Sequence, residues 1–485
     1  MEDYQPDPKR WKALSVTLVA GFMSLLDVSI VSVALPSVQH GLGASPAAVQ
    51  WVVSGYALAF GLVLVPAGRL GDAIGRRTMF LAALGGFVVC SAAAGLAPTT
   101  GALIAARLAQ GMCAGALAPQ NSALIQQLFR GAERGRAFGF FGATVGFSTA
   151  VGPVVGGLIL ALAGEDQGWR WIFYVNVPIG LAALVLAARL IPRADPGPRG
   201  DLDPVGVLLL GAGVLALMLP LVLAESGGLV TLWWLFLVGA ALLVLFVRWE
   251  RRVSARGRQP VLDVRLFTTT PGYASGSALG TVYFIGFSGI WLVFALFFQN
   301  GLGYTPLQSG LAVTSFAIGS AASSVVGGRL VEAWGRKLTV TGLSLVGAGL
   351  AATAVVLWLA PPSAAGLAAA PALLVAGIGG GWVVAPNTTI TLRHVPVTMA
   401  GAAGGALQTG QRIGSAVGTA GLAGVFYAVL TGSGGDYEQA VGVSVGVAAL
   451  TVLAALVIAV AELRSRPRCP KAVDKDLEHA LPDPN

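Results

Sequence analysis

The ten residues GRLGDAIGRR, at positions 68 to 77, return 260 positions later as GRLVEAWGRK, at positions 328 to 337. A shorter stretch, LGASP at 42 to 46, returns at the same offset as LGYTP at 302 to 306. Two matches that share one offset are hard to obtain by chance, so they indicate an internal repeat. The repeat predicts two halves of similar fold, and the rest of the predicted architecture depends on it.

The composition around the repeat is that of a chain embedded in lipid. Hydrophobic residues make up 55% of the 485 residues and charged residues only 11%, whereas soluble proteins carry about 25% charged residues. A membrane span needs about 20 predominantly apolar residues, and fourteen candidate spans lie between residues 12 and 461. We therefore expect an all-α polytopic membrane protein.

The repeat also groups the predicted spans. It equates the second span with the tenth, so spans one to six match spans nine to fourteen, and spans seven and eight, about 203 to 223 and 229 to 247, form an insert. Parallel six-helix repeats describe a transporter of two bundles with its substrate site at mid-membrane between them. The predicted domains are an N-terminal six-helix bundle at 1 to 196, a two-helix insert at 197 to 255, a C-terminal six-helix bundle at 256 to 466, and a disordered cytoplasmic tail at 467 to 485.

Lysine and arginine lie almost entirely on one side of the predicted spans. The loops after even-numbered spans hold most of them, and the opposite loops hold almost none. By the positive-inside rule, both termini are cytoplasmic. The formal net charge of +8 is then largely a signal of topology, so we expect the inner (cytoplasmic) cell membrane as the location and no nucleic-acid partner.

The cysteines and histidines do not indicate a cofactor. The three cysteines, Cys90, Cys113 and Cys469, have neither a disulfide framework nor zinc-ligand spacing. The three histidines lie in separate loops or in the tail. We expect no metal, no cofactor and no enzyme activity, with a proton gradient as the energy source.

Seven segments of the chain carry recognisable motifs. They are LDVSIVSVALP (26 to 36), GRLGDAIGRR (68 to 77), RLAQGMCAGALAP (107 to 119), GFFGATVGFSTAVGPVVGG (139 to 157), WRWIFYVNVPIG (169 to 180), PVLDVRLF (260 to 267) and QTGQRIGSAVG (408 to 418). In this order and topology they resemble the major facilitator superfamily, specifically its fourteen-span drug:proton antiporter branch. The first-helix segment departs from the usual motif, because Ser29 and Ser32 stand where Thr and Asn are common. The resemblance covers nearly the whole chain and implies the major facilitator fold.

Asp27 is the one carboxylate inside a predicted span, and Arg107 and Arg412 are the other charges clearly inside spans. Charges there are costly and usually functional. A rise of 1.5 Å per residue places Asp27 roughly 13 Å and Arg107 roughly 9 Å from the outer ends of their helices. The resemblance places both helices in one bundle beside the cavity, so a contact between the two side chains is expected.

We predict that Asp27 and Arg107 couple proton movement to transport. Burial favours a protonated Asp27, Arg107 favours the ionised form, and the balance changes with the water content of the cavity. Two alternatives stay open for Asp27, namely that it contacts only the substrate or that it is only a structural partner of Arg107. Each arginine also has the alternative of bonding only to carbonyl groups of a neighbouring helix.

The substrate cavity is predicted less sharply, because aromatic residues on apolar helices more often face lipid or the core. One carboxylate against two arginines in the spans makes the cavity neutral or positive, which argues against dications. The candidate cavity residues are Tyr56, Gln110, Phe147, Tyr283, Trp291, Phe294, Trp382, Gln408, Gln411 and Arg412.

Two further groups of residues are candidates for conformational roles. In the repeated loop, Asp72 either serves only topology and a turn or acts as a latch with cationic groups at a neighbouring helix end, with Arg136 as the candidate partner. The glycine-rich fifth span either packs closely or forms a hinge or seal. The gate candidates are Gly68, Asp72, Gly75, Arg76, Arg77, Arg136, Glu332 and Arg336, and the hinge candidates are Gly146, Gly152, Pro153, Gly156 and Gly157.

Together these features predict a monomeric proton-coupled exporter of amphipathic or hydrophobic small molecules, such as drugs, dyes or antibiotics, that works by alternating access. Export of one specific metabolite or antibiotic, and uptake by a symporter of the same fold, are the alternatives within this fold. A channel would conduct without saturation or proton counter-transport. A membrane-embedded enzyme or receptor would need a catalytic constellation or a soluble output domain.

Overall fold

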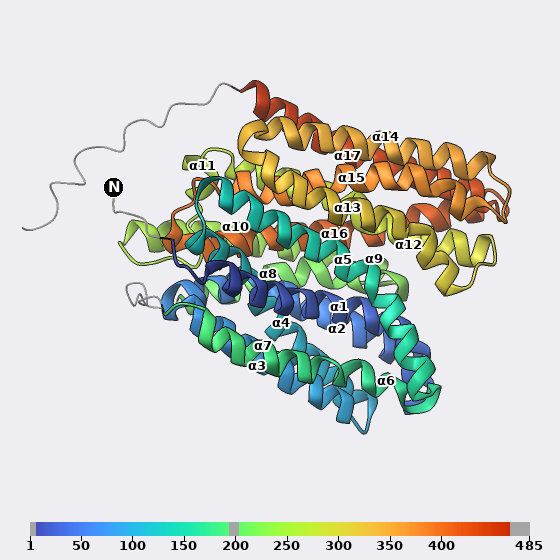
Figure 1. Ribbon diagram of the computed structural model, residues 1–485, viewed down its shortest axis with the longest axis horizontal. Helices are drawn as coiled ribbons and strands as arrows, with labels where there is room; N and C mark the ends of the chain where they lie inside the picture. Colours follow the sequence, from blue (N-terminus) through green and yellow to red (C-terminus); the bar gives the residue numbers. More distant parts are fainter. Residues whose placement is uncertain (1–5, 194–202, 466–485) are drawn as a thin grey trace, which may run out of the picture.

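The computed structural model describes residues 6 to 193 and 203 to 465, and the regular elements of these residues are all helices. Figure 1 shows the helices running roughly parallel along one axis. The predicted tail at 467 to 485 and the first residues of the predicted insert lie outside the described residues. The described chain is therefore an all-α protein, as predicted.

Most of the helices are long enough to cross a bilayer. Twelve helical segments within the described residues are long and apolar enough to do so. The long helices are α1 (Arg10–Leu42), α2 (Pro46–Ile74), α3 (Arg76–Leu96), α4 (Thr100–Leu128), α5 (Gly131–Ala163), α8 (Pro204–Val222), α10 (Trp234–Ala255), α12 (Tyr273–Leu296), α13 (Pro306–Trp334), α14 (Arg336–Leu359), α15 (Ala365–Thr391), α16 (Ala400–Gly432) and α17 (Tyr437–Arg464). The short elements are α6 (Glu165–Tyr174), α7 (Asn176–Leu190), η1 (Ala224–Ser226), α9 (Gly228–Thr231), α11 (Leu266–Thr269), η2 (Phe297–Gly301) and η3 (Val397–Met399).

The fifth and eighth of the fourteen predicted spans have no counterpart among these twelve segments. α5 is a continuous helix, but some of its side chains lie outside the described residues, and only Val154–Ala163 is counted as a shorter apolar helix. The eighth predicted span, 229 to 247, is interrupted between α9 and α10, and α10 carries Arg248, Glu250 and Arg251. Twelve spans are thus supported, and the number fourteen stays a prediction.

The internal repeat is confirmed by the helix boundaries. α2 begins at Pro46 and α13 at Pro306, and both helices contain 29 residues. Each is capped by a hydroxyl group of the preceding residue, Ser45 or Thr305, which accepts a hydrogen bond from a backbone N–H in the first turn. Each ends at a glycine of positive φ, which permits the sharp turn into α3 or α14.

The predicted sixth span is a helix with a break. α6 ends at Tyr174 and α7 begins at Asn176. Pro178 has no N–H to donate to the carbonyl of Tyr174, and its ring crowds that carbonyl, which explains the break at Val175. The break places Asn176 at the first position of α7, beside the site described below.

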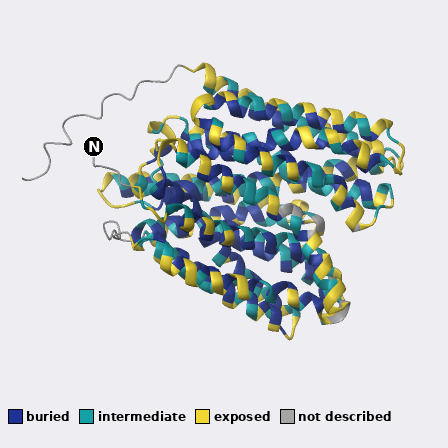
Figure 2. Ribbon diagram, in the orientation of Figure 1, coloured by how far each residue is buried: buried dark blue, intermediate teal, exposed yellow. Residues whose placement is uncertain are grey.

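Large apolar side chains on the outer surface support a membrane location. Leu450, Leu453 and Val457 are 53% to 63% exposed along one face of α17, and Figure 2 shows exposed residues along the outer helices. Soluble monomers rarely expose large contiguous apolar patches. These faces therefore suit contact with lipid.

One end of the molecule, here called the basic end, carries the start of α1, the end of α17 and the arginine-rich turns (left in Figure 1). At this end the two halves of the chain pack closely. A Cβ atom added to Gly68 of α2 would lie 2.2 Å from the carbonyl oxygen of Gly401 on α16, and one added to Gly135 of α5 would lie 2.6 Å from that of Gly328 on α13. Only glycine allows such approach, and the basic end is closed.

The same helices separate toward the opposite end. Farther along α5, Gly152 and Gly156 no longer face α13 but pack against Ser29 and Ile30 of α1. Figure 1 accordingly shows α12 to α15 diverging from α1, α2 and α6 on the right. The structure therefore shows a state that is closed at the basic end and splayed at the other.

The helices of the predicted insert, α8 and α10, pack on each other, and α8 contacts α2. Below the apolar part of α10, which ends at Val247, the carboxyl group of Glu250 is fully buried and accepts a hydrogen bond from the backbone N–H of Leu262 at 3.4 Å. Burial raises the pKa of Glu250 to about 7, and the nearby Asp203 acts in the same direction.

This burial predicts a pH-dependent stability. A carboxyl pKa that is raised in the folded state adds stability that is fully present below the unfolded pKa of about 4.5 and is lost as the pH rises through 7. We expect the thermal unfolding midpoint in detergent to fall between pH 5 and pH 8, and to fall less in Glu250→Gln. Glu332→Gln, which changes an exposed glutamate, is the control. Equal pH dependence in wild type and Glu250→Gln would contradict the assignment.

Candidate functional site: a buried ion pair

Asp27 lies near the middle of α1 and forms an ion pair with Arg107 of α4. The guanidinium Nη1 donates to the carboxylate Oδ2 at 2.5 Å. The Asp27 side chain is fully buried and that of Arg107 is 1% exposed. The structure thus brings together the two residues that the sequence singled out for proton coupling.

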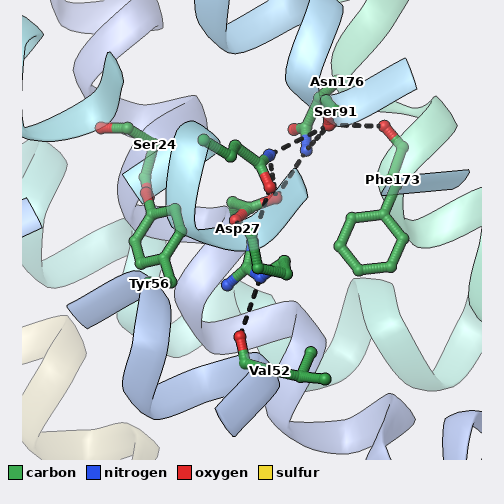
Figure 3. Close-up of polar contacts among 9 residues, drawn as sticks. Ser24, Asp27, Val52, Tyr56, Ser91, Phe173 and Asn176 are labelled. Carbon is green, nitrogen blue, oxygen red and sulfur yellow. Dashed lines mark hydrogen bonds and ion pairs between the residues drawn. The ribbon is translucent and has the colours of Figure 1, made fainter. Parts of the chain in front are cut away.

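Two amide side chains complete the surroundings of the Asp27 carboxylate, and Figure 3 labels one of them, Asn176. Gln110, one helical turn after Arg107 on α4, donates to Oδ1 at 3.1 Å, and Asn176 of α7 donates to the same oxygen at 2.8 Å. Ser91 of α3 accepts a hydrogen bond from each amide at 3.1 Å and donates to the carbonyl of Phe173 at 3.0 Å. Side chains from α4 and α7 therefore contact the carboxylate of α1, and Ser91 of α3 holds both amides in place.

Arg107 is held from the other side by α2. Its Nε donates to the carbonyl oxygen of Val52 at 3.0 Å, and its guanidinium lies 4.2 Å from the centre of the Tyr56 ring. The Tyr56 hydroxyl group in turn donates to the carbonyl of Ser24 on α1 at 3.0 Å. The cation is thus sandwiched between its counter-ion and an aromatic face, which is a favourable place for a buried guanidinium.

Within this arrangement, the carboxylate of Asp27 is the group that can bind a proton. The charges of Asp27 and Arg107 balance while the carboxylate is ionised, and a proton on Asp27 removes the main partner of Arg107 but leaves its bonds to Gln110 (2.7 Å) and Val52. Because Asp27 is fully buried, proton exchange requires the helices around it to separate. Protonation of Asp27 is therefore linked to movement of α1, α4 and α7, which enclose its carboxylate.

The other predicted cavity residues do not gather around this pair. Tyr283 and Phe294 of α12 are each 1% exposed and pack, with Trp291, in an aromatic cluster between α12 and α13. Trp382 lies beside the glycines of α13 and α14, whereas Phe147 is 56% exposed and stacks on Phe22. Most of these aromatic residues serve helix packing in this state.

Two of the polar cavity candidates of α16, Gln408 and Arg412, lie where the two halves meet. Gln408 donates to the carbonyl of Ala118 at 3.4 Å and to the Ser122 hydroxyl at 3.2 Å, both on α4. Gln411 lies beside Gly280 of α12. Arg412 lies over the ring of Phe60 on α2, 4.3 Å from its centre.

Asp72, in the last turn of α2, contacts a helix end of the other half through backbone N–H groups and not through the candidate partner Arg136. Its oxygens accept hydrogen bonds from the backbone N–H groups of Gly401 (3.1 Å) and Ala402 (3.0 Å), at the start of α16. Arg76 pairs with the same carboxylate at 3.1 Å and also donates to the carbonyl of Val397. Arg136, by contrast, is exposed; a helix N-terminus supplies the positive end instead.

The second copy of the loop is built differently. The gate candidate Glu332, which corresponds to Asp72, is exposed and does not form a cluster like that of Asp72 and Arg76. Arg336 instead donates to Asn387 at 2.5 Å and pairs with Glu462 of α17 at 2.8 Å. Of the remaining gate candidates, Arg77 donates to the carbonyl of Ala188 at 2.5 Å, and Gly75 forms the turn after α2.

The predicted hinge residues lie on a helix that is continuous in this state. Gly146 packs against α13, and Gly152 and Gly156 pack against α1, whereas an added Cβ at Gly157 would meet nothing within 4 Å. The side chain of Pro153 lies outside the described residues. Close packing accounts for these glycines here, and a hinge role stays a prediction.

The contact of Asp72 with α16 predicts a gate that opens when the carboxylate is removed. Asn in place of Asp72 would keep at most one of the two backbone hydrogen bonds and lose the ion pair with Arg76. We expect opening of the basic end to become about 10- to 100-fold more favourable, since one hydrogen bond to a charged group contributes about 1.5 to 3 kcal/mol. Spin labels at Ile74 and Arg393 would measure the distance across the gate. A distance distribution like that of wild type, or an equal change in Glu332→Gln, would contradict a latch.

Two residues of the site, Ser91 and Asn176, were not singled out from the sequence. Asn176 stands inside the segment WRWIFYVNVPIG, and a polar amide in an apolar span is itself a signal of function.

The basic end also contains a cavity of about 540 Å³, which is lined by Arg69, Pro260 and Met399 among others. It lies on the far side of the gate from the ion pair. Among the described residues there is no group of three metal-ligating side chains.

A bundle of membrane-crossing helices with a repeated architecture and a buried ion pair defines a membrane transporter. The family described as Major Facilitator Superfamily matches residues 17–247 and 276–481, and the chain belongs to this family of transporters. The resemblance read from the sequence motifs is thereby confirmed.

Named relatives and a solved structure agree. The chain is 36% identical over 434 residues to the probable actinorhodin transporter of Streptomyces coelicolor, covering 88% of this chain and 74% of that protein. It is 37% identical over 427 residues to the puromycin resistance protein pur8 of Streptomyces alboniger, covering 86% and 81%. The crystal structure of the human organic anion transporter MFSD10 superposes with a TM-score of 0.69 at 16% identity, covering 94% of this chain and all of that one, which shows a shared fold.

Proposed function

We propose that this protein exports amphipathic or hydrophobic small molecules, such as drugs, dyes or antibiotics, in exchange for protons. The observation that carries the proposal is the fully buried carboxylate of Asp27, held at mid-helix by Arg107 and two amides. The names of the actinorhodin and puromycin relatives support the substrate class.

In this proposal, Asp27 alternates between an ionised form paired with Arg107 and a protonated form without that pair. The ionised form suits the closed packing of α1, α4 and α7 around the carboxylate. Protonation weakens the attraction between α1 and α4, so the helices rearrange, and the proton is released toward the other side of the membrane. Each full cycle moves one proton inward and substrate outward.

The magnitudes are sufficient for export. One charge that moves through 100 mV yields about 2.3 kcal/mol, which sustains roughly a fifty-fold gradient of a neutral substrate per proton. A free energy of about 2.3 kcal/mol is also enough to shift the populations of two transporter conformations that differ by a few kcal/mol.

We further propose that the basic end is cytoplasmic, because its turns hold the arginines. Both termini are then cytoplasmic in an inner-membrane protein that works as a monomer. α5 and the apolar part of α10 complete fourteen spans, arranged as two six-helix bundles with α8 and α10 as the insert. The packing of the equivalent pairs α2 with α16 and α13 with α5 supports this arrangement.

Transport in reconstituted vesicles tests the proposal. Purified protein is placed in liposomes, a pH gradient is imposed in either direction, and the movement of a neutral dye, a monoanionic dye and the dication methyl viologen is followed. Dye movement opposite to the proton flux, with saturation and with little transport of the dication, is expected. Movement in the same direction as protons would instead indicate a symporter, and transport of only one compound in a wide panel would indicate a specific exporter.

A further inference from the structure

Arg412 is the charged group inside the spans that the ion pair leaves unexplained. It lies on α16, roughly 18 Å along the helix from the basic end, and its guanidinium faces the ring of Phe60 on α2 at 4.3 Å. Among residues 6 to 193 and 203 to 465 it makes no hydrogen bond and no ion pair. Arg107, the other arginine clearly inside a predicted span, has Asp27 as its counter-ion.

The position of Arg412 is that of a ligand-binding group rather than a packing group. Its side chain is of intermediate exposure, and its nitrogen atoms are not among the fully buried unpaired polar atoms of the described residues. It lies between α2 and α16, about two helical turns beyond the close contact of Gly405 with Leu64. A guanidinium has five N–H donors and binds carboxylates and phosphates in a fork-like geometry, and within the described residues none of the Arg412 donors has a hydrogen-bond acceptor.

The aromatic residues of α2 connect Arg412 with the proton site. Tyr56 lies against Arg107 at 4.2 Å, the rings of Tyr56 and Phe60 are 6.3 Å apart, and Phe60 lies against Arg412. A ligand bound at Arg412 therefore sits one aromatic pair away from Arg107. The one mid-span carboxylate that could neutralise Arg412, Asp27, is already engaged by Arg107.

We propose that Arg412 binds an anionic group of the exported substrate, so that amphipathic monoanions, such as carboxylates or sulfonates on an aromatic skeleton, are the preferred substrates. This inference rests on the export function proposed above. The guanidinium binds the anion, and the apolar surface around Phe60 contacts the skeleton. Outward movement of one monoanion for each inward proton transfers two charges, whereas a neutral substrate transfers one.

A matched pair of fluorescent probes tests the inference. 8-Anilinonaphthalene-1-sulfonate is a monoanion, and N-phenyl-1-naphthylamine is the same skeleton without the sulfonate. Transport of both is measured in proteoliposomes for wild type, Arg412→Gln, Arg412→Lys and the control Arg189→Gln, which changes an exposed arginine of α7. Equilibrium binding of each probe to the purified proteins is measured in parallel.

We expect Arg412→Gln to raise the half-saturating concentration of the sulfonate by about 10- to 100-fold, the size expected for a lost charged hydrogen bond. The neutral probe should change by less than about threefold, and Arg412→Lys should recover part of the sulfonate affinity. Sulfonate export by wild type should respond to membrane potential twice as steeply as export of the neutral probe.

Three results would overturn the inference. Equal losses for both probes in Arg412→Gln would make Arg412 structural. Proton-driven transport of the neutral probe alone by wild type would reject the anion site and leave the export function intact. If neither probe were transported, the export function would fail, and unchanged sulfonate binding by Arg412→Gln would then reject the anion site separately.

Discussion

Replacement of Asp27 by Asn is expected to abolish the proton-driven accumulation of substrate. Asn has nearly the same shape, and its side-chain oxygen can still accept from Gln110 or Asn176, but it cannot bind and release a proton. The gradient sustained by one proton, roughly fifty-fold at 100 mV, should therefore collapse to equality. Downhill movement of substrate should continue, because the binding surface and the gate remain.

The measurement is dye transport in proteoliposomes with and without a pH gradient. Glu332→Gln is the matched control, because it removes an exposed carboxylate of α13 and should leave the gradient unchanged. Full accumulation of dye by Asp27→Asn would refute the coupling role. Loss of downhill transport as well would assign Asp27 to substrate binding instead, the first of the alternatives that the sequence left open.

Loss of Arg107 should be the most destabilising single change in the site. Arg107→Met leaves the carboxylate of Asp27 buried without its counter-ion, and removal of one partner of a buried pair costs about 3 to 5 kcal/mol. The variant Asp27→Asn with Arg107→Met contains no unpaired charge and should recover most of that loss. Unfolding in detergent by heat or denaturant measures the stability of all three variants.

The double variant is the decisive comparison. If Asp27 and Arg107 interact as the 2.5 Å contact indicates, their effects on the free energy of unfolding are far from additive. Additive effects would show that Arg107 acts mainly through Val52 and Tyr56. That result would return Arg107 to a structural role and would remove the physical basis of the coupling proposal.

Much of the fold follows from the sequence, because the repeat and the apolar periodicity are properties of the chain itself. The offset of 260 predicts that α2 and α13 begin and end alike, and they do. The contact of Asp27 with Arg107 is also predictable, since depth along each helix follows from residue number and a buried charge needs a partner. That second prediction also needs the family resemblance, which places both helices in one bundle.

The parts that could not be predicted depend on how helices are rotated and where their ends meet. Asn176 reaches Asp27, and Ser91 reaches the two amides beside it, because α7 and α3 turn those faces inward. Nothing in the spacing of these residues fixes that rotation. Arg136 was the natural partner for Asp72 on charge alone, yet backbone N–H groups of Gly401 and Ala402 take that place. Backbone donors at a helix start are invisible to any count of charged side chains.

The contact of Asp72 with Gly401 and Ala402 makes the first turn of α16 depend on a residue of α2. The first N–H groups of a helix have no partner within the helix, and here two of them are satisfied by Asp72, a residue 329 positions earlier in the chain for Gly401. When the basic end opens, these amides exchange the carboxylate for water, so the first turn of α16 frays. Amide hydrogen exchange at Gly401 and Ala402 should then rise in step with the population of the open state. Hydrogen exchange at these two backbone amides therefore reports the opening of the basic end without an attached probe.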